Sequence, residues 1–207
     1  MSADDDTRRL QAANPTGWFE DLYAEADAGT ASVPWDQPHP QRHLVEWAAG
    51  VDGTGRSALV VGCGYGRDSE FLATLGFDVT AFDISPTGIT AVQARHPDSK
   101  VRYVVADLLS PPAEWHHAFD LVVENMTVQA LPVDQHAQAI EQVAWLTGSQ
   151  LLVLAVAREE GSVADGPPWP LTPSEIKAFA VDGLAPVKIR RDEVRWTAEF
   201  VRQVAMN

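Results

Sequence analysis

The chain has 207 residues, a formal net charge of −14 and a single cysteine, Cys63. One cysteine cannot form an internal disulfide or a cysteine-based zinc cage. The excess of acidic residues disfavours binding to nucleic acid or to an anionic membrane surface. The longest apolar run, Leu151–Ala157, is too short to span a bilayer, and the acidic start Met1–Asp6 is not a secretory signal. We expect a single cytoplasmic domain over residues 1–207 that binds a small molecule, with residues 1–15 disordered.

Short apolar runs alternate with helical patterns between residues 57 and 157. The predicted strands are residues 57–61, 78–82, 101–105, 119–123 and 150–157, and the predicted helices are residues 68–75, 86–96 and 133–146. Ser85 precedes one of these helices as its cap, Asp134 is expected to cap the helix over residues 133–146, and Pro86 stands at a first helical position. This alternation predicts a parallel, doubly wound sheet with helices on both faces.

The last fifty residues follow a different pattern. A loop over residues 158–170, rich in glycine, proline and acidic residues, leads to a short predicted helix over residues 172–180. Strands over residues 187–190 and 195–204 are then joined by a polar turn without a helix, so they must be antiparallel. The expected fold class is α/β, with a Rossmann-like, mostly parallel seven-stranded sheet, an antiparallel last strand and a core over residues 57–204.

Glycines follow the first predicted strand. Ligands of such sheets bind beyond the carboxyl ends of the strands, where glycines let the backbone approach a ligand and a helix N-terminus offers free N–H groups. Gly62, Gly64 and Gly66 are spaced as G-x-G-x-G, whereas the dinucleotide fingerprint needs its third glycine three positions after the second. The spacing therefore disfavours NAD or FAD.

Aspartates follow the next two strands. Asp83 ends the second strand, where a carboxylate can accept both hydroxyls of an adenosine ribose. The alternative for Asp83 is a cap on the next helix, a position that Ser85 fills better. Asp107 follows the third strand, where it either accepts a hydrogen bond from an adenine amine or is an ordinary loop residue.

In this order and spacing, the motifs resemble the class I S-adenosylmethionine-dependent methyltransferases over about residues 57–204. The resemblance implies S-adenosylmethionine as cofactor, with the glycine loop on its methionine part, Asp83 on its ribose, and Asp107 and Leu108 beside its adenine. That family often has an acid two residues before the first glycine, where this chain has Val60; Asp68 is either a substitute or a helix cap. The implied cofactor residues are Trp18, Trp35, Gly62, Cys63, Gly64, Gly66, Asp83, Ile84, Asp107, Leu108, Glu124 and Asn125.

The N-terminal segments Trp18–Tyr23 and Pro34–Asp36 resemble the leading segment of the thiopurine, thiol/halide and tellurite-resistance methyltransferases. In that branch this segment folds over the cofactor and helps to close the substrate pocket. Residues 16–50 are therefore expected to form a lid and a helix. The alternative is that Trp18 and Trp35 only pack a leading helix onto the sheet.

The residues at the end of the fourth strand limit the classes of molecule that could accept the methyl group. Glu124–Thr127 lacks the Pro-Pro-aromatic turn typical of enzymes that methylate amino groups of bases or glutamine, and Cys63 lies in the glycine loop rather than at a nucleophile position. A thiolate, halide or metalloid anion needs mainly positioning. A hydroxyl or amine needs a general base, for which Glu124 and His39 are candidates; an exposed loop residue is the alternative for His39.

The sequence thus predicts a methyltransferase of a small molecule, closest to the thiol branch, acting as a monomer or homodimer. One alternative is an O- or N-methyltransferase of a specialised metabolite that uses Glu124 or His39 as base. Another is a non-catalytic S-adenosylmethionine-binding protein, which the missing acid at Val60 motivates.

The other histidines are expected on the surface. His116 and His117 precede the fourth strand, and His43 and His136 suit helix surfaces. No histidine and acid pair has ligand spacing, so no metal site is predicted.

Overall fold

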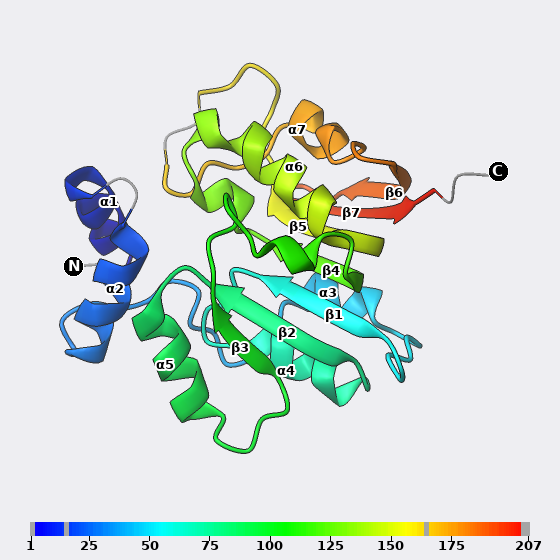
Figure 1. Ribbon diagram of the computed structural model, residues 1–207. Coiled ribbons are helices and arrows are strands. Elements are labelled where there is room, and N and C mark those ends of the chain that lie inside the picture. Colours follow the sequence, from blue (N-terminus) through cyan, green and yellow to red (C-terminus); the bar gives the residue numbers. More distant parts are fainter. Residues whose placement is uncertain (1–2, 15–16, 164–165, 204–207) are drawn as a thin grey trace.

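A twisted sheet of seven strands forms the centre of the computed structural model, which describes residues 3–14, 17–163 and 166–203 (Figure 1). The strands are β1 (Ser57–Val61), β2 (Asp78–Asp83), β3 (Arg102–Val105), β4 (Phe119–Asn125), β5 (Thr147–Val156), β6 (Leu184–Arg191) and β7 (Arg195–Arg202). Their order in the sheet is β3-β2-β1-β4-β5-β7-β6. β1 to β5 pair in parallel, and β7 pairs antiparallel with both β5 and β6. The predicted fold class is confirmed.

Helices cover both faces of this sheet. They are α1 (Ala3–Ala13), α2 (Trp18–Asp27), α3 (Arg42–Trp47), α4 (Arg67–Thr74), α5 (Pro86–Arg95), α6 (His136–Leu146) and α7 (Pro173–Ala178), with 3-10 turns η1 (Ala113–Trp115), η2 (Val128–Ala130) and η3 (Val133–Gln135). Apolar residues of α3, α4 and α5 pack on one face, and those of α6, α7 and η1 pack on the other. None of the helices in the described ranges is long and apolar enough to cross a membrane.

Strands β1, β4 and β5 are apolar on both sides because each places side chains in the hydrophobic core on both faces of the sheet. Leu59 of β1 and Val122 of β4 belong to the core beneath α6, whereas Val60 and Val123 belong to the core beneath α4. All four side chains are at most 2% exposed. A strand covered on both faces needs no polar alternation, which is why these segments read as continuous apolar runs.

The N-terminal residues correct one prediction. Residues 3–13, expected to be disordered, form α1, while residues 1–2 and 15 lie outside the described ranges. Leu10 is buried against α2 in a cluster with Trp18 and Leu22, and Arg9 Nη1 donates to Glu25 Oε1 at 3.2 Å. The segment was expected to be disordered because most of its residues are polar, but the burial of Leu10 anchors it to α2.

The helix predicted over residues 133–146 is correct in extent but divided. It starts as the 3-10 turn η3 and becomes α6 only at His136. Gln135 is the residue that precedes α6, and Asp134 lies inside η3, so the prediction of Asp134 as the cap is wrong. The other predicted elements match within a few residues, as expected of boundaries read from periodicity.

Truncation of Leu121 should test the importance of the doubly covered sheet. Leu121 is fully buried in β4. We expect Leu121→Ala to lower the free energy of unfolding by about 2–5 kcal/mol, because transfer and cavity costs add. Urea denaturation measures this loss. Val105→Ala, at a β3 position with 48% exposure, is the matched control and should cost less than about 1 kcal/mol; equal losses would contradict the assignment of the core.

Candidate functional site

A cavity of about 890 Å³ lies beyond the carboxyl ends of β1, β2 and β4. Its walls come from the loop after β1, the ends of β2 and β4, the loop after β3, and α2 with the segment that follows it. Residues near the β6–β7 turn and the Pro167–Pro168 pair complete the walls. Most of the predicted site residues line it: Trp18, Trp35, His39, Gly62, Cys63, Gly64, Asp83, Ile84, Asp107, Leu108 and Asn125. Gly66 and Glu124 do not.

The glycine loop takes a conformation that side chains would obstruct. Gly64 has φ +53°, and a Cβ there would lie 3.0 Å from Cδ1 of Trp35, so the lid rests directly on this backbone. Gly66 has φ +81° and is the N-cap of α4; its Cβ would lie 2.3 Å from the Tyr103 hydroxyl oxygen. Gly66 therefore packs the loop against its surroundings, and its contact with the cofactor stays a prediction.

Asp83 ties the glycine loop to the start of α5. Its Oδ2 accepts from the Gly64 N–H and its Oδ1 from the Ser85 N–H, both at 3.1 Å. Burial raises the pKa of Asp83, and the backbone N–H groups act in the opposite direction. Ser85 Oγ accepts from the Gly88 N–H and caps the helix, so Asp83 is not the cap. Asp83 also lines the cavity, which keeps a ribose contact open to it.

The region after β2 and β3 offers apolar surfaces to the cavity. Ile84 is 42% exposed although it is aliphatic, whereas Leu108 is buried. Both line the cavity. The neighbouring Asp107 accepts from the Leu109 N–H through Oδ1 at 2.8 Å. This arrangement could hold a flat, apolar ring with a polar edge, as the predicted adenine contacts require.

The end of β4 presents an unpaired acceptor. Asn125 Nδ2 donates to Asp68 Oδ2 at 2.7 Å, while Asn125 Oδ1 is buried and has no partner among the described residues. Both residues line the cavity. A buried acceptor beside a carboxylate suits a cationic amino group, because it is costly to leave such an oxygen unsatisfied. The methionine end of S-adenosylmethionine carries such a group.

The sequence motifs did not predict that Arg67 and Asp68 bind the backbone of residues 35–41. Asp68 Oδ1 accepts from the Gln41 N–H at 2.8 Å, and the N-cap of α4 is Gly66, so Asp68 is not the helix cap. Arg67 Nη1 donates to the His39 carbonyl at 2.8 Å, and Nη2 donates to the Trp35 carbonyl. The first turn of α4 thus holds the backbone of residues 35–41. In the sequence, the only indication of this contact is that Arg67 and Asp68 directly follow the glycine loop.

The N-terminal segment forms an aromatic wall of the cavity. Trp18 stacks on Phe19 with ring centroids 3.9 Å apart and meets Trp35 edge-on at 6.1 Å. Trp35 Nε1 donates to the Tyr23 hydroxyl at 2.8 Å. Trp18 is 2% exposed and packs in the N-terminal cluster, yet it also lines the cavity. The packing and the lid interpretations of Trp18 are therefore compatible.

The two candidate bases lie in very different surroundings. His39 is exposed and lines the cavity. Glu124 is fully buried, and its Oε1 accepts from the N–H groups of Thr127 at 2.7 Å and Val128 at 3.0 Å. Burial raises the pKa of Glu124 to about 7 despite these two N–H groups. Glu124 does not line the cavity, and its carboxyl holds the turn after β4. Its predicted roles as base and cofactor contact stay predictions.

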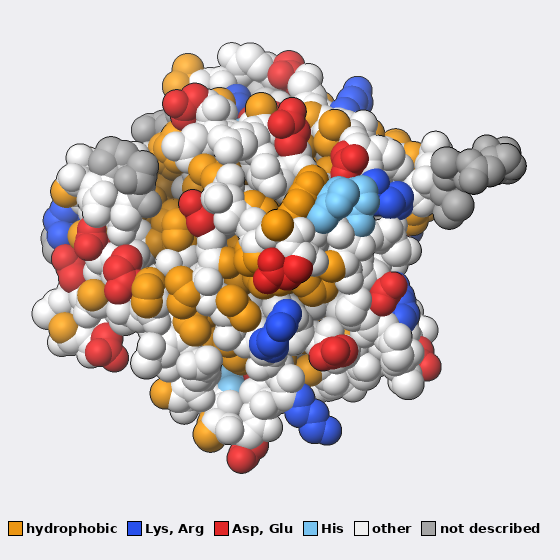
Figure 2. Space-filling view, viewed as in Figure 1, with side chains coloured by type: hydrophobic (Ala, Val, Ile, Leu, Met, Phe, Trp, Pro, Cys, Tyr) orange, Lys and Arg blue, Asp and Glu red, His pale blue; other side chains and the backbone are white. Residues whose placement is uncertain are grey.

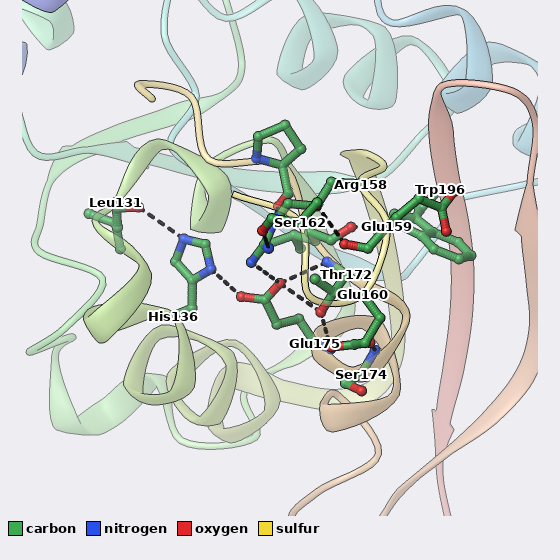
Figure 3. Close-up of polar contacts among 12 residues, drawn as sticks. Leu131, His136, Arg158, Glu159, Glu160, Ser162, Thr172, Ser174, Glu175 and Trp196 are labelled. Atoms are coloured by element: carbon green, nitrogen blue, oxygen red, sulfur yellow. Dashed lines mark hydrogen bonds and ion pairs between the residues drawn. The ribbon is translucent and has the colours of Figure 1, made fainter. Parts of the chain in front are cut away.

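A buried polar network supports the wall of the cavity near Leu131 (Figure 3). His136 Nδ1 lies 2.6 Å from Glu175 Oε1, and its Nε2 lies 2.9 Å from the Leu131 carbonyl. Glu175 also joins Thr172 in a capping box and lies 3.3 Å from Arg158 Nη2. Burial raises the pKa of Glu175, but the hydrogen bonds of His136 and Thr172 outweigh it and hold this pKa at about 2. His136, predicted on a helix surface, is 2% exposed because α7 packs over it.

The fold also gathers three side chains far from this cavity. Ligand atoms of His116, His117 and Asp182 lie within 4.8 Å of one another. His117 Nε2 is 2.7 Å from Asp182 Oδ2, and Arg202 Nη2 lies 3.2 Å from the same oxygen. The positive charge of Arg202 beside the Asp182 carboxylate disfavours the binding of a cation there. The prediction that the protein has no metal site stays a prediction.

Glu124 should make stability depend on pH. Its pKa is about 7 in the folded chain against an ordinary value of 4.5, so the folded state binds more protons between these values. The free energy of unfolding therefore falls as the pH rises through this window. Glu124→Gln keeps an acceptor for the turn and cannot ionise. We expect its stability relative to the unmodified chain to rise by about 2–3 kcal/mol between pH 4.5 and 7.5.

Urea denaturation of both chains at several pH values measures this difference. Other titrating groups are common to the two chains and cancel. A stability difference that does not change with pH would contradict the raised pKa of Glu124.

Comparison with known proteins agrees with this geometry. Residues 58–148 match a protein family described as a methyltransferase domain. A ubiquinone biosynthesis O-methyltransferase of Xanthomonas oryzae pv. oryzae is 32% identical over 127 residues, which cover 56% of this chain and 53% of that protein. The chain thus spans about half the length of the curated relatives that it matches.

Solved structures share the fold at low identity. One, from a study of the conversion of a disulfide bond into a thioacetal group during echinomycin biosynthesis, has a TM-score of 0.70 and 20% identity over 89% of this chain and 93% of that one. A TehB-like methyltransferase from Corynebacterium glutamicum has a TM-score of 0.61 and 20% identity, covering 93% of this chain and all of that one. The chain therefore shares the fold of these proteins, and its residues 58–148 are similar to a methyltransferase domain.

Proposed function

We propose that this protein is an S-adenosylmethionine-dependent methyltransferase of a small molecule. The observation that carries the proposal is the pairing, in one cavity, of a left-handed glycine loop with the unpaired Oδ1 of Asn125 beside Asp68. The matching methyltransferase domain and the curated O-methyltransferase support it. The predicted cytoplasmic location, the absence of nucleic-acid partners and the oligomeric state stay predictions.

Each part of the proposed cofactor has a counterpart in the cavity. Asn125 and Asp68 would hold the methionine amino group, and the glycine loop would follow the methionine chain. Asp83 would accept from the ribose hydroxyls, since it lines the cavity and each carboxylate oxygen can accept more than one hydrogen bond. Ile84 and Leu108 would enclose the adenine. The bound cofactor would supply an electrophilic methyl group on a positively charged sulfur.

The chain contributes positioning and exclusion of water. Trp18, Phe19 and Trp35 form the aromatic wall, whose faces favour a sulfonium charge. Arg67 and Asp68 hold the lid over the glycine loop, which keeps water from the transferred methyl group. Correct positioning alone can supply roughly 7–11 kcal/mol of the barrier reduction.

A soft acceptor such as a thiol suits this cavity best. Its aspartates, Asp68, Asp83, Asp107 and Asp192, already accept hydrogen bonds from neighbouring backbone N–H groups, which hold them in structural contacts. A thiolate needs no base. The resemblance of residues 18–36 to the thiol and tellurite-resistance branch and the TehB-like neighbour support this choice.

A second candidate function is O-methylation of a small metabolite. The curated relative named for ubiquinone O-methylation favours it. In that case His39 stays a candidate base. His43 is another, because it lines the cavity and its Nε2 lies 3.2 Å from Asp192 Oδ2, which would orient the ring.

Calorimetric titration with S-adenosylmethionine, S-adenosylhomocysteine and NADH tests the cofactor assignment. We expect micromolar binding of the first two and none of NADH. Asp83→Asn should weaken binding by about 1–3 kcal/mol through the loss of a charge-assisted contact. Asp98→Asn, in an exposed loop, is the matched control. Unchanged affinity in a folded Asp83→Asn protein would remove Asp83 from the site.

The lid should respond to the cofactor. Residues 17–41 contact the glycine loop through Arg67, Asp68 and Gly64, so a bound cofactor should slow their cleavage by protease. We expect severalfold slower cutting in this segment with S-adenosylhomocysteine, read by mass spectrometry. Arg67→Met should speed the cutting without cofactor. Equal cleavage with and without ligand would count against the lid.

A further inference from the structure

A second cavity, of about 760 Å³, opens between α3 and the strands β5, β7 and β6. Five of its lining residues are lysine or arginine and three are aspartate or glutamate, on a chain whose net charge is −14. The cations are Arg42, Arg56, Lys188, Arg190 and Arg191. The lining of this cavity therefore carries a net positive charge, whereas the whole chain is strongly negative.

Three of these cations have no carboxylate partner within 4 Å in the described part of the chain. Arg42 pairs with Glu46 and Arg191 with Glu159, each at 2.6 Å. Arg56 lies over the ring of Phe77 and contacts Gln150, whereas the side chains of Lys188 and Arg190 form no hydrogen bond or ion pair with other described residues. These unpaired groups repel one another, so an anion placed among them would be stabilised.

The strand geometry explains why the charges converge. Side chains two residues apart on a strand point to the same face, so Lys188 and Arg190 of β6 project together. Across the β6–β7 pair they stand opposite Glu199 and Thr197, respectively. Glu199 offsets part of the charge of Lys188, and the Thr197 hydroxyl adds a donor beside Arg190. Trp47 and Val51 supply an apolar side.

The cationic cavity adjoins the proposed methyltransferase cavity. Arg42, His43 and Asp192 line both. The contact of His43 Nε2 with Asp192 Oδ2, at 3.2 Å, joins α3 to the β6–β7 turn at this boundary. A molecule that occupies the part of the first cavity beside His43 therefore has a cationic space next to it.

We propose that the cationic cavity binds an anionic group, a phosphate or a carboxylate, of the methyl acceptor. This inference rests on the proposed function. It makes the substrate class a small anionic molecule whose charged end lies against Lys188, Arg190 and Arg56, while its nucleophilic atom faces the cofactor site. An ordinary solvated surface is the alternative that the test must exclude.

The test titrates pyrophosphate and citrate into protein saturated with S-adenosylhomocysteine. We expect saturable binding of at least one of them, and the stronger ligand distinguishes phosphate from carboxylate. Lys188→Glu/Arg190→Glu should weaken this binding at least tenfold. Lys100→Glu/Lys177→Glu makes the same charge change at exposed positions outside the cavity lining and should leave binding within about twofold.

Kinetics with a methyl acceptor then tests the link between the cavities. The bound anion should compete with the acceptor but not with S-adenosylmethionine, and the β6 double variant should raise KM for an anionic acceptor at least tenfold. No anion binding, or equal loss in both double variants, would overturn the site. Binding without competition would overturn its role in acceptor recognition.

Failure of the proposed function would look different. In that case S-adenosylhomocysteine would not bind to the unmodified chain, whatever the anions do. The lack of cofactor binding would reject the methyltransferase, and anion binding sensitive to the β6 variant would then report a site without that role.

Discussion

Two adjacent charged residues, Arg67 and Asp68, connect residues 35–41 to the glycine loop, and the arrangement of the candidate site depends on them. Gly66 adopts a left-handed conformation, so α4 begins immediately after the glycine loop. Its first turn can then donate to carbonyls of residues 35 and 39 and accept from the N–H of residue 41. Asp68 also binds Asn125 at the end of β4. One helical turn therefore joins three segments that are distant in sequence: the glycine loop, residues 35–41 and the end of β4.

Two buried carboxyl groups at neighbouring strand ends show how similar residues acquire different roles. Asp83 and Glu124 stand at the carboxyl ends of β2 and β4, and each accepts two backbone N–H groups. Asp83 shares them between its two oxygens and lines the cavity. Glu124 receives both on Oε1, and its Oε2 is buried without a partner in the described ranges. Burial then raises its pKa to about 7, while its Oε1 stabilises the turn after β4.

Periodicity predicted the sheet because burial on both faces leaves a strong local pattern, as in Leu151–Val156 of β5. The sequence could also place the glycine loop and Asp83 at the same edge of the sheet, because both belong to one β-α-β unit. Contacts between distant segments leave no such pattern. His136 was expected on a surface because its partner, Glu175, comes from a helix 39 residues later. Arg67 was missed because it binds backbone carbonyls, which carry no residue identity.

The charge distribution has a consequence for what the protein can bind. At physiological salt, electrostatic effects are screened beyond about 8 Å. A small anion inside the cationic cavity would therefore be influenced mainly by Lys188, Arg190 and Arg56, whereas a long polyanion would also meet the acidic residues that give the chain its charge of −14. A small charged acceptor of the kind proposed would thus be attracted, whereas a long polyanion would be repelled. Local pairing, more than net charge, decides which anions are bound, because only unpaired cations gain from a ligand.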